Sequence, residues 1–166
     1  MRIKIVLFIL LSFLFYSCST QKSITCEKEL YDVVNTSLSS YNIELEYNEL
    51  KYHREGIYLS SIIINQEDTK SILNNIETNN IKNLSDEQYV FHAWKKTPVQ
   101  NDFDVSLTNY SPVSSNVQNV LITLNTSLTT VNSYYSYLQN VNNPFVNLLY
   151  VFIPENNRII IYYSIF

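Results

Sequence analysis

The sequence is poor in glycine, cysteine and charge, and each shortage excludes a class of function. One glycine in 166 residues leaves no glycine-rich phosphate loop and no G-x-S-x-G turn for a nucleophilic serine. There is also no H-E-x-x-H pair of zinc-binding histidines and no catalytic cysteine–histidine signature. We therefore expect no cofactor and no metal site, and no motif identifies an enzyme.

Basic residues are few as well, and this restricts the partners. Eleven Lys and Arg stand against 15 Asp and Glu, for a formal net charge of −4. Proteins that bind nucleic acid, or adhere to anionic lipid by charge, gather Lys and Arg on one surface. The acidic balance therefore predicts no nucleic-acid partner.

The N-terminal residues have the layout of a secretory signal. Arg2 and Lys4 give a positive start, and an apolar run over residues 5–16 follows, broken only by Ser12. The run is well short of the roughly 20 residues that a membrane-spanning helix needs. The stretch therefore predicts a cleaved signal peptide, in preference to a permanent span or a buried N-terminal helix.

Residues 15–18, Phe-Tyr-Ser-Cys, resemble the lipobox of bacterial lipoproteins. In that family signal peptidase II cuts before the cysteine, whose thiol carries diacylglycerol and whose new amino group is usually acylated. The resemblance implies attachment to a lipid bilayer through acylated Cys18, in the bacterial cell envelope and facing the periplasm. More than one acyl chain is needed for such an anchor. The alternative is cleavage by an ordinary signal peptidase.

The chain has two cysteines, Cys18 and Cys26. Lipidation of Cys18 leaves Cys26 without a partner, as a free thiol at the start of the first helix. An unlipidated Cys18 can instead form a disulfide with Cys26 across a short loop. The two interpretations exclude each other.

Cleavage before Cys18 also sets the domain organisation. It removes residues 1–17 and leaves 149 residues with 9 basic and 15 acidic side chains, a typical size for one domain. We expect residues 18–24 to form a tether and residues 25–166 to form a single α+β domain.

Apolar spacing and capping residues predict three helices in the first half of the chain. They run from about Cys26 to Tyr41, from an N-cap at Asp68 through Ile76, and from a capping box at Ser85 and Gln88 to before Pro98. In the last of these, Leu84 and Tyr89 have the spacing of a hydrophobic staple.

The remaining apolar segments predict strands. They cover Ile43–Tyr47, Ile57–Ile64 after a hairpin loop at His53–Gly56, Val120–Leu124, Val131–Tyr137, Phe145–Ile153 and Arg158–Phe166, the last two joined by a turn at Pro154–Asn157. We expect an α+β fold with N-terminal helices packed on an antiparallel β meander. Its element order is similar to that of cystatin-like and NTF2-like folds, a resemblance that implies no function.

Two histidines and three carboxylates are the candidates for catalysis. They are His53 beside Glu55, His92, Asp102 and Asp104. A histidine within reach of a carboxylate is a common acid–base pair of hydrolases. Polar turn residues and a packed histidine explain the same pattern without chemistry, because no second titratable cluster flanks them.

The pair Asp102 and Asp104 also offers hard oxygen ligands for calcium. The glycine of a calcium loop is missing, and Val113 stands where its closing glutamate would fall. This segment therefore predicts an acidic loop instead of a metal site.

The sequence favours a non-enzymatic binding, assembly or immunity module of the cell envelope, with an unidentified protein or glycan partner. The alternative is a periplasmic hydrolase that uses His53 or His92 with a nearby carboxylate.

Overall fold

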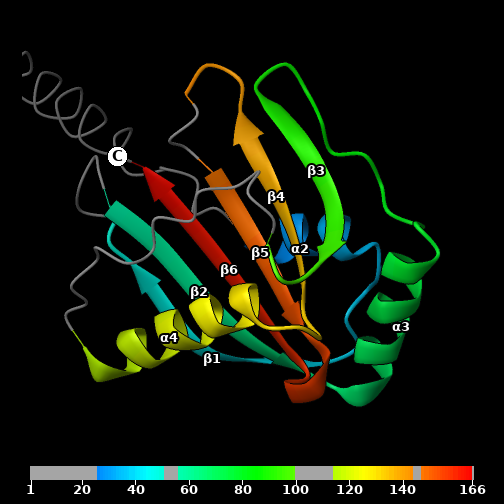
Figure 1. The fold of residues 1–166 in the computed structure, drawn as a ribbon, viewed down its shortest axis with the longest axis horizontal. Coiled ribbons are helices and arrows are strands. Elements are labelled where there is room, and N and C mark those ends of the chain that lie inside the picture. The colour runs from blue at the N-terminus through cyan, green and yellow to red at the C-terminus, as the bar shows by residue number, and fades with distance from the viewer. Residues whose placement is uncertain (1–25, 51–55, 100–113, 144–146, 166) are drawn as a thin grey trace, which may run out of the picture. The chain divides into compact units, whose positions relative to one another are not determined.

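The structure is a computed structural model that describes residues 26–50, 56–99, 114–143 and 147–165. The chain divides into two compact units, Met1–Leu30 and Tyr31–Phe166. The second unit combines helices with one six-stranded antiparallel sheet (Figure 1). The α+β class that the sequence predicts is therefore confirmed.

The described residues form three helices, six strands and one short 3-10 helix. Their bounds are α2 Cys26–Val34, β1 Tyr41–Asn48, β2 Gly56–Ile64, α3 Gln66–Glu77, β3 Tyr89–Lys96, α4 Ser115–Thr129, β4 Tyr134–Asn140, β5 Asn147–Ile153, η2 Pro154–Asn156 and β6 Arg158–Ile165.

The sheet has the strand order β1-β2-β6-β5-β4-β3, and every neighbouring pair is antiparallel. Strands β3 to β6 follow one another as a meander, and β6 then pairs with β2 of the β1–β2 hairpin (Figure 1). The predicted meander is thus present, and β6 joins it to the hairpin. The strands at the two open edges are β1 and β3.

The predicted hairpin of β5 and β6 is present and forms the centre of the sheet. Pro154 opens the connecting 3-10 turn, and Asn157 closes it in the left-handed region with φ of 49°, which asparagine tolerates well. Ile159, Ile160 and Ile161 are at most 2% exposed. Successive strand residues point to opposite faces, so both faces of β6 are covered.

Helix α4 covers one of these faces (Figure 1). Its core cluster consists of Ile57, Leu59, Val117, Val120, Leu121, Leu124, Leu128, Tyr135, Tyr137, Leu149, Val151, Ile153, Ile160 and Tyr162. The contributions from α4 recur every three or four residues, which is the period of a helix. Ser114 caps the helix by accepting a hydrogen bond from Val117 N at 3.4 Å.

The predicted strand at Val120–Leu124 is therefore wrong, because these residues belong to α4. Val120 and Leu124 fit both a period of two and a helical period. Ile122, which an alternating strand would bury with them, is 57% exposed. The helix that covers this face thus comes from the second half of the chain, whereas the sequence places the covering helices near the N-terminus.

The predicted helix over residues 85–97 is also wrong, because β3 occupies this stretch. Of the predicted capping box, Ser85 does accept a main-chain hydrogen bond, but from Phe91 N and not from Gln88 N, and Asp86, which is not part of the box, accepts as well. Asp86 Oδ1 accepts from Tyr89 N at 2.8 Å, and Ser85 Oγ accepts from Phe91 N at 3.0 Å. Such bonds also close turns, and the Tyr, Val, Phe and Trp that follow favour a strand.

Helix α2 ends earlier than the predicted Cys26–Tyr41. Asn35 follows its last residue in the left-handed region, with φ of 50°, a common way for a helix to end. Asn75 of α3 donates to the carbonyls of Val34 and Asn35 at 3.4 and 3.0 Å. These bonds satisfy carbonyls that the helix end leaves without partners.

Helix α3 confirms the prediction of a helix here, but Asn65 is its N-cap and accepts from Asp68 N at 2.8 Å. The Asp68 carboxylate is 5% exposed. It accepts from Ser39 N, Ser39 Oγ and Asn65 Nδ2 at 2.8 to 3.2 Å. It thereby ties the segment before β1 to the first turn of α3.

Strand β1 differs from the simple alternation that its sequence predicts. A β-bulge lies between Ile43 and Leu45, so the alternation shifts by one residue there. Leu45 and Tyr47 pack against the α4 core cluster. Ile43, predicted on the same side, is 44% exposed.

The only glycine begins β2 with a positive φ, as predicted for the hairpin. Gly56 has φ of 145°, and a Cβ at this position would lie 2.8 Å from Glu49 Oε2. Glycine is the residue that meets both constraints without strain. The rest of the loop, His53–Glu55, lies outside the described residues.

Candidate functional site

Most of the candidate residues from the sequence lie outside the part of the chain that the structure describes. They are Cys18 with the whole signal segment, His53, Glu55, Asp102 and Asp104. His92 is described, and the geometry around it is the starting point for a site.

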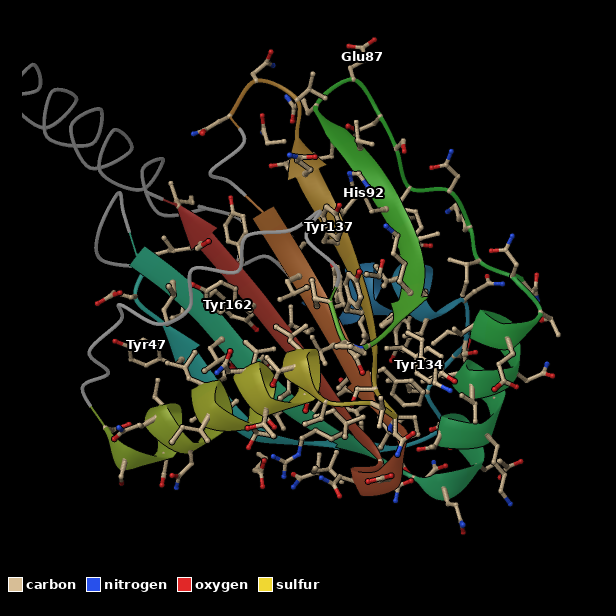
Figure 2. The ribbon with its side chains drawn as sticks, in the orientation of Figure 1. Tyr47, Glu87, His92, Tyr134, Tyr137 and Tyr162 are labelled. Atoms are coloured by element: carbon tan, nitrogen blue, oxygen red, sulfur yellow. The ribbon has the colours of Figure 1, made fainter. Side chains whose placement is uncertain are left out.

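His92 lies in β3 and is held by two neighbours on β4 (Figure 2). Its ring stacks on Tyr137, with centroids 4.0 Å apart and planes inclined by 12°. His92 Nε2 lies 3.3 Å from Gln139 Oε1. Among the described residues no carboxylate contacts the ring, so this part of the chain does not build the acid–base pair that a hydrolase needs.

His92 and Tyr137 begin a row of side chains that crosses the whole sheet on the α4 face. The strand register aligns His92, Tyr137, Leu149, Tyr162, Leu59 and Tyr47, one residue from each strand between β3 and β1. We call these six residues the tyrosine row. Figure 2 shows its labelled members along a diagonal of the sheet.

The tyrosine row contains no carboxylate and no amine. Tyr137 and Tyr162 are 5% and 7% exposed, whereas Tyr47 and His92 are half-buried. Burial raises the pKa of the Tyr162 phenol, and a hydrogen bond with Ser164 acts in the opposite direction. Aromatic rings with hydroxyl groups provide contact area and hydrogen bonds. The middle of the row is therefore part of the packed core under α4, and only its two ends, Tyr47 and His92, are accessible.

A second aromatic group, on the opposite face, connects the helices to β3 and β4. Trp94 Nε1 donates to the carbonyl of Val33 at 3.0 Å, and the ring of Tyr134 lies 6.3 Å from that of Phe152. Burial raises the pKa of Tyr134, and the neighbouring Glu77 carboxylate adds to the shift. Trp94 is thus a packed side chain, and these contacts join α2 and α3 to the sheet.

An ion pair ties the edge strand β1 to β6. Arg158 Nη2 lies 3.2 and 3.1 Å from the two carboxylate oxygens of Glu44, and Ser61 Oγ donates to Oε2 at 3.0 Å. The side chains of Arg158 and Glu44 are 19% and 45% exposed. The pair spans the intervening strand β2 and fixes the β1 bulge.

Nowhere in the described ranges do three or more His, Cys, Asp or Glu side chains gather in an arrangement that holds a metal ion. None of the helices that the structure describes has the length and apolar character to cross a membrane.

The tyrosine row is a feature that the sequence does not reveal. Alternation within a strand indicates which residues share a face. It does not indicate which strands are neighbours or how they are aligned. Tyr47, Tyr137 and Tyr162 come from three distant segments, and only the register brings them into one row.

Comparison of the chain with protein-family models, with curated proteins and with solved structures finds no match.

Proposed function

We propose that this chain is a lipid-anchored protein of the bacterial cell envelope that acts by binding a partner, as a binding, assembly or immunity module. The signal layout of residues 1–17 and the lipobox-like context of Cys18 support the anchor. The acidic balance argues against nucleic acid as the partner.

The observation that carries the binding role is the environment of His92. Its imidazole stacks on an aromatic ring and meets an amide oxygen, which favours a fixed, packed side chain. The tyrosine row continues this packed surface across the sheet. The two half-buried ends of the row, Tyr47 and His92, leave aromatic and hydrogen-bonding groups accessible to a partner, which supports binding as the function of the domain.

The arrangement of one long helix, α4, on one face of an antiparallel sheet supports a fold of the cystatin-like or NTF2-like kind. Such folds serve many unrelated functions. The proposed binding role therefore rests on the residues of this chain and not on the fold.

Labelling with fatty acid tests the anchor. Labelled palmitate should enter the membrane fraction of cells that express the full chain, and Cys18→Ser should abolish the label. Cys26→Ser is the matched control and should keep it, because Cys26 lies beyond the predicted cleavage point. Equal labelling of the parent chain and Cys18→Ser would rule out the lipoprotein assignment.

The second cysteine gives an independent check of the same proposal. With Cys18 acylated, Cys26 has no partner within the chain and should react with a thiol reagent in the unfolded protein without prior reduction. A requirement for reductant would instead indicate a disulfide, within the chain or between chains.

A further inference from the structure

The two open edges of the sheet differ in how far their main chains are already engaged. At β3 the preceding segment bonds to the edge. Asp86 N donates to the carbonyl of Tyr89 at 2.9 Å, Asp86 Oδ1 accepts from Tyr89 N at 2.8 Å, and Ser85 Oγ accepts from Phe91 N at 3.0 Å. A β-bulge and two lysines follow along the strand. The bulge is a feature that β1 shares, whereas lysines on an edge strand discourage pairing with another strand.

At Ile43 and Glu46 the outer side of β1 has no such cover from the described residues. Glu49 N donates to Ile57 O at 3.0 Å, and bonded and non-bonded pairs alternate along an antiparallel ladder. When this alternation is followed along β1 and across its bulge, the main-chain N–H and C=O groups of Ile43 and Glu46 point away from β2. In the described part of the chain, neither side chains nor loop main chain bond to the main chain of these two residues.

The side chains of Ile43 and Glu46 give this edge a specific character. They pair with Ile62 and Ser60, which are two residues apart on β2 and so share one face. Ile43 is 44% exposed. Glu46 is exposed and has no ion-pair partner among the residues that the structure describes. The edge thus presents an apolar side chain and an unneutralised carboxylate.

We propose that β1 receives a seventh strand from another protein, in the antiparallel orientation of every other pair in the sheet. The incoming segment carries Lys or Arg opposite Glu46 and, two residues later, an apolar side chain opposite Ile43. Main-chain hydrogen bonds supply the affinity of strand addition, and alternate side chains supply the specificity. This inference rests on the proposed binding role and names the chemistry of its partner.

The same charges argue against a second copy of the chain as the added strand. Pairing of β1 with β1 of another copy would align Glu44 and Glu46 of both copies along one seam, and like charges across a strand pair are unfavourable. Pairing with β3 of another copy would have to displace the hydrogen bonds of Ser85 and Asp86. The edge therefore selects a basic partner over self-association.

A charge-reversal experiment tests the proposal on the full chain in mild detergent. The probe is a short Thr-rich peptide that carries one Lys and, two positions later, one Ile; the second probe has Glu in place of Lys. Fluorescence anisotropy should show that the Lys peptide binds, about 2- to 5-fold more tightly than the Glu peptide, the size expected of one cross-strand charge pair. Glu46→Lys should reverse this preference.

Two control variants keep the result interpretable. Glu87→Lys makes the same charge change at an exposed residue outside β1 and should leave the preference unchanged. Glu46→Pro removes the outward N–H and keeps the pairing with β2, so it should weaken both peptides at least 10-fold. Thermal unfolding of the variants should match the parent within a few degrees, because Glu46 is exposed.

Three outcomes would overturn the proposal. They are no measurable binding of the Lys peptide, a preference that survives Glu46→Lys, and a dimer of the chain that the peptide dissociates, which would identify a second copy as the natural occupant. None of the measurements involves Cys18. Failure of acylation and failure of strand addition are therefore distinguishable.

Discussion

The edges β1 and β3 lie at opposite ends of one sheet and solve the same problem in different ways. An edge strand exposes main-chain groups to pairing with other chains, and proteins protect it with bulges, charges or a covering loop. Strand β3 uses all three, because Ser85 and Asp86 bond to its outer side. Strand β1 has a bulge and carboxylates. A covered edge excludes every partner, whereas a charged edge selects among partners.

The two edges belong to separate parts of the chain that meet at β6. In the described sheet, β1 and β2 form one part, β3, β4 and β5 form the other, and β6 pairs with both. The ion pair between Arg158 and Glu44 reaches from β6 to the bulge in β1. Changes at β6 should therefore disturb both edges, and changes at one edge should remain local.

The largest effect is expected from deletion of β6, the strand that joins the two parts of the sheet. Ending the chain at Arg158 deletes Ile159, Ile160 and Ile161, all of them fully buried. Each isoleucine is worth about 1.5–3 kcal/mol of burial, against about 5–15 kcal/mol for the stability of a domain. The shortened chain should show no cooperative thermal unfolding. A cooperative transition at the parent midpoint would show that β6 is peripheral.

A smaller loss of stability is expected when the Asp86 side chain, which bonds to the outer side of β3, is removed. Asp86→Ala removes the side-chain acceptor of Gln88 N and Tyr89 N and should cost about 0.5–2 kcal/mol, as the loss of a capping residue does. Denaturant titration measures it. Glu87→Ala, at the exposed neighbouring residue, should cost less than about 0.5 kcal/mol. Equal losses for the two variants would show that Asp86 does not secure the edge.

The ion pair between Glu44 of β1 and Arg158 of β6 should contribute even less to the free energy of unfolding. Glu44→Gln keeps the shape of the side chain and removes the charge that faces Arg158. Because Glu44 is 45% exposed, solvent screens the pair, and we expect a loss of about 0.2–1 kcal/mol that shrinks in 1 M salt. Asp32→Asn, which breaks the more exposed pair with Lys82, is the control and should cost less. A loss that high salt leaves unchanged would contradict an electrostatic role.

The smallest effect concerns the centre of the sheet, between the two edges, and is seen in alkaline solution. The pKa of Tyr162 is raised in the folded protein, mainly by burial. The unfolded chain therefore loses this proton first, and the stability contributed by the neutral phenol falls as the pH rises above about 10. Tyr162→Phe should reduce the fall in thermal midpoint between pH 8 and pH 11. An identical fall in both proteins would contradict the assignment.

The sequence predicts an element of this fold correctly where its local pattern of apolar residues fits only one type of secondary structure. Ile159–Ile165 is apolar on both faces, which only a central strand accommodates, and this prediction is confirmed. Val120 and Leu124 fit two periods, and Val117, Leu121 and Leu128 decide for a helix. Ser85 is correctly predicted as a side-chain acceptor, but its bond to Phe91 N, with those of Asp86, closes a turn before a strand and does not begin a helix.

The candidate site is less predictable than the fold because it depends on register. Nothing in the segments around Tyr47, Tyr137 and Tyr162 indicates that they meet in one row. The open character of Glu46 depends in the same way on a bulge of one residue and on the position of β1 in the sheet. Long-range pairing decides both features, and it leaves no local signature.

Amide hydrogen exchange of the full chain, resolved by residue, compares the two edges most directly. The amides of Tyr89 and Phe91, held by Asp86 and Ser85, should be protected at least 10-fold more than the outward amides of Ile43 and Glu46. Addition of the Lys peptide should raise protection at Ile43 and Glu46 and leave that of Tyr89 and Phe91 unchanged. Equal protection of the two edges without peptide would contradict the claim that β3 is covered at Tyr89 and Phe91 and that β1 is accessible at Ile43 and Glu46.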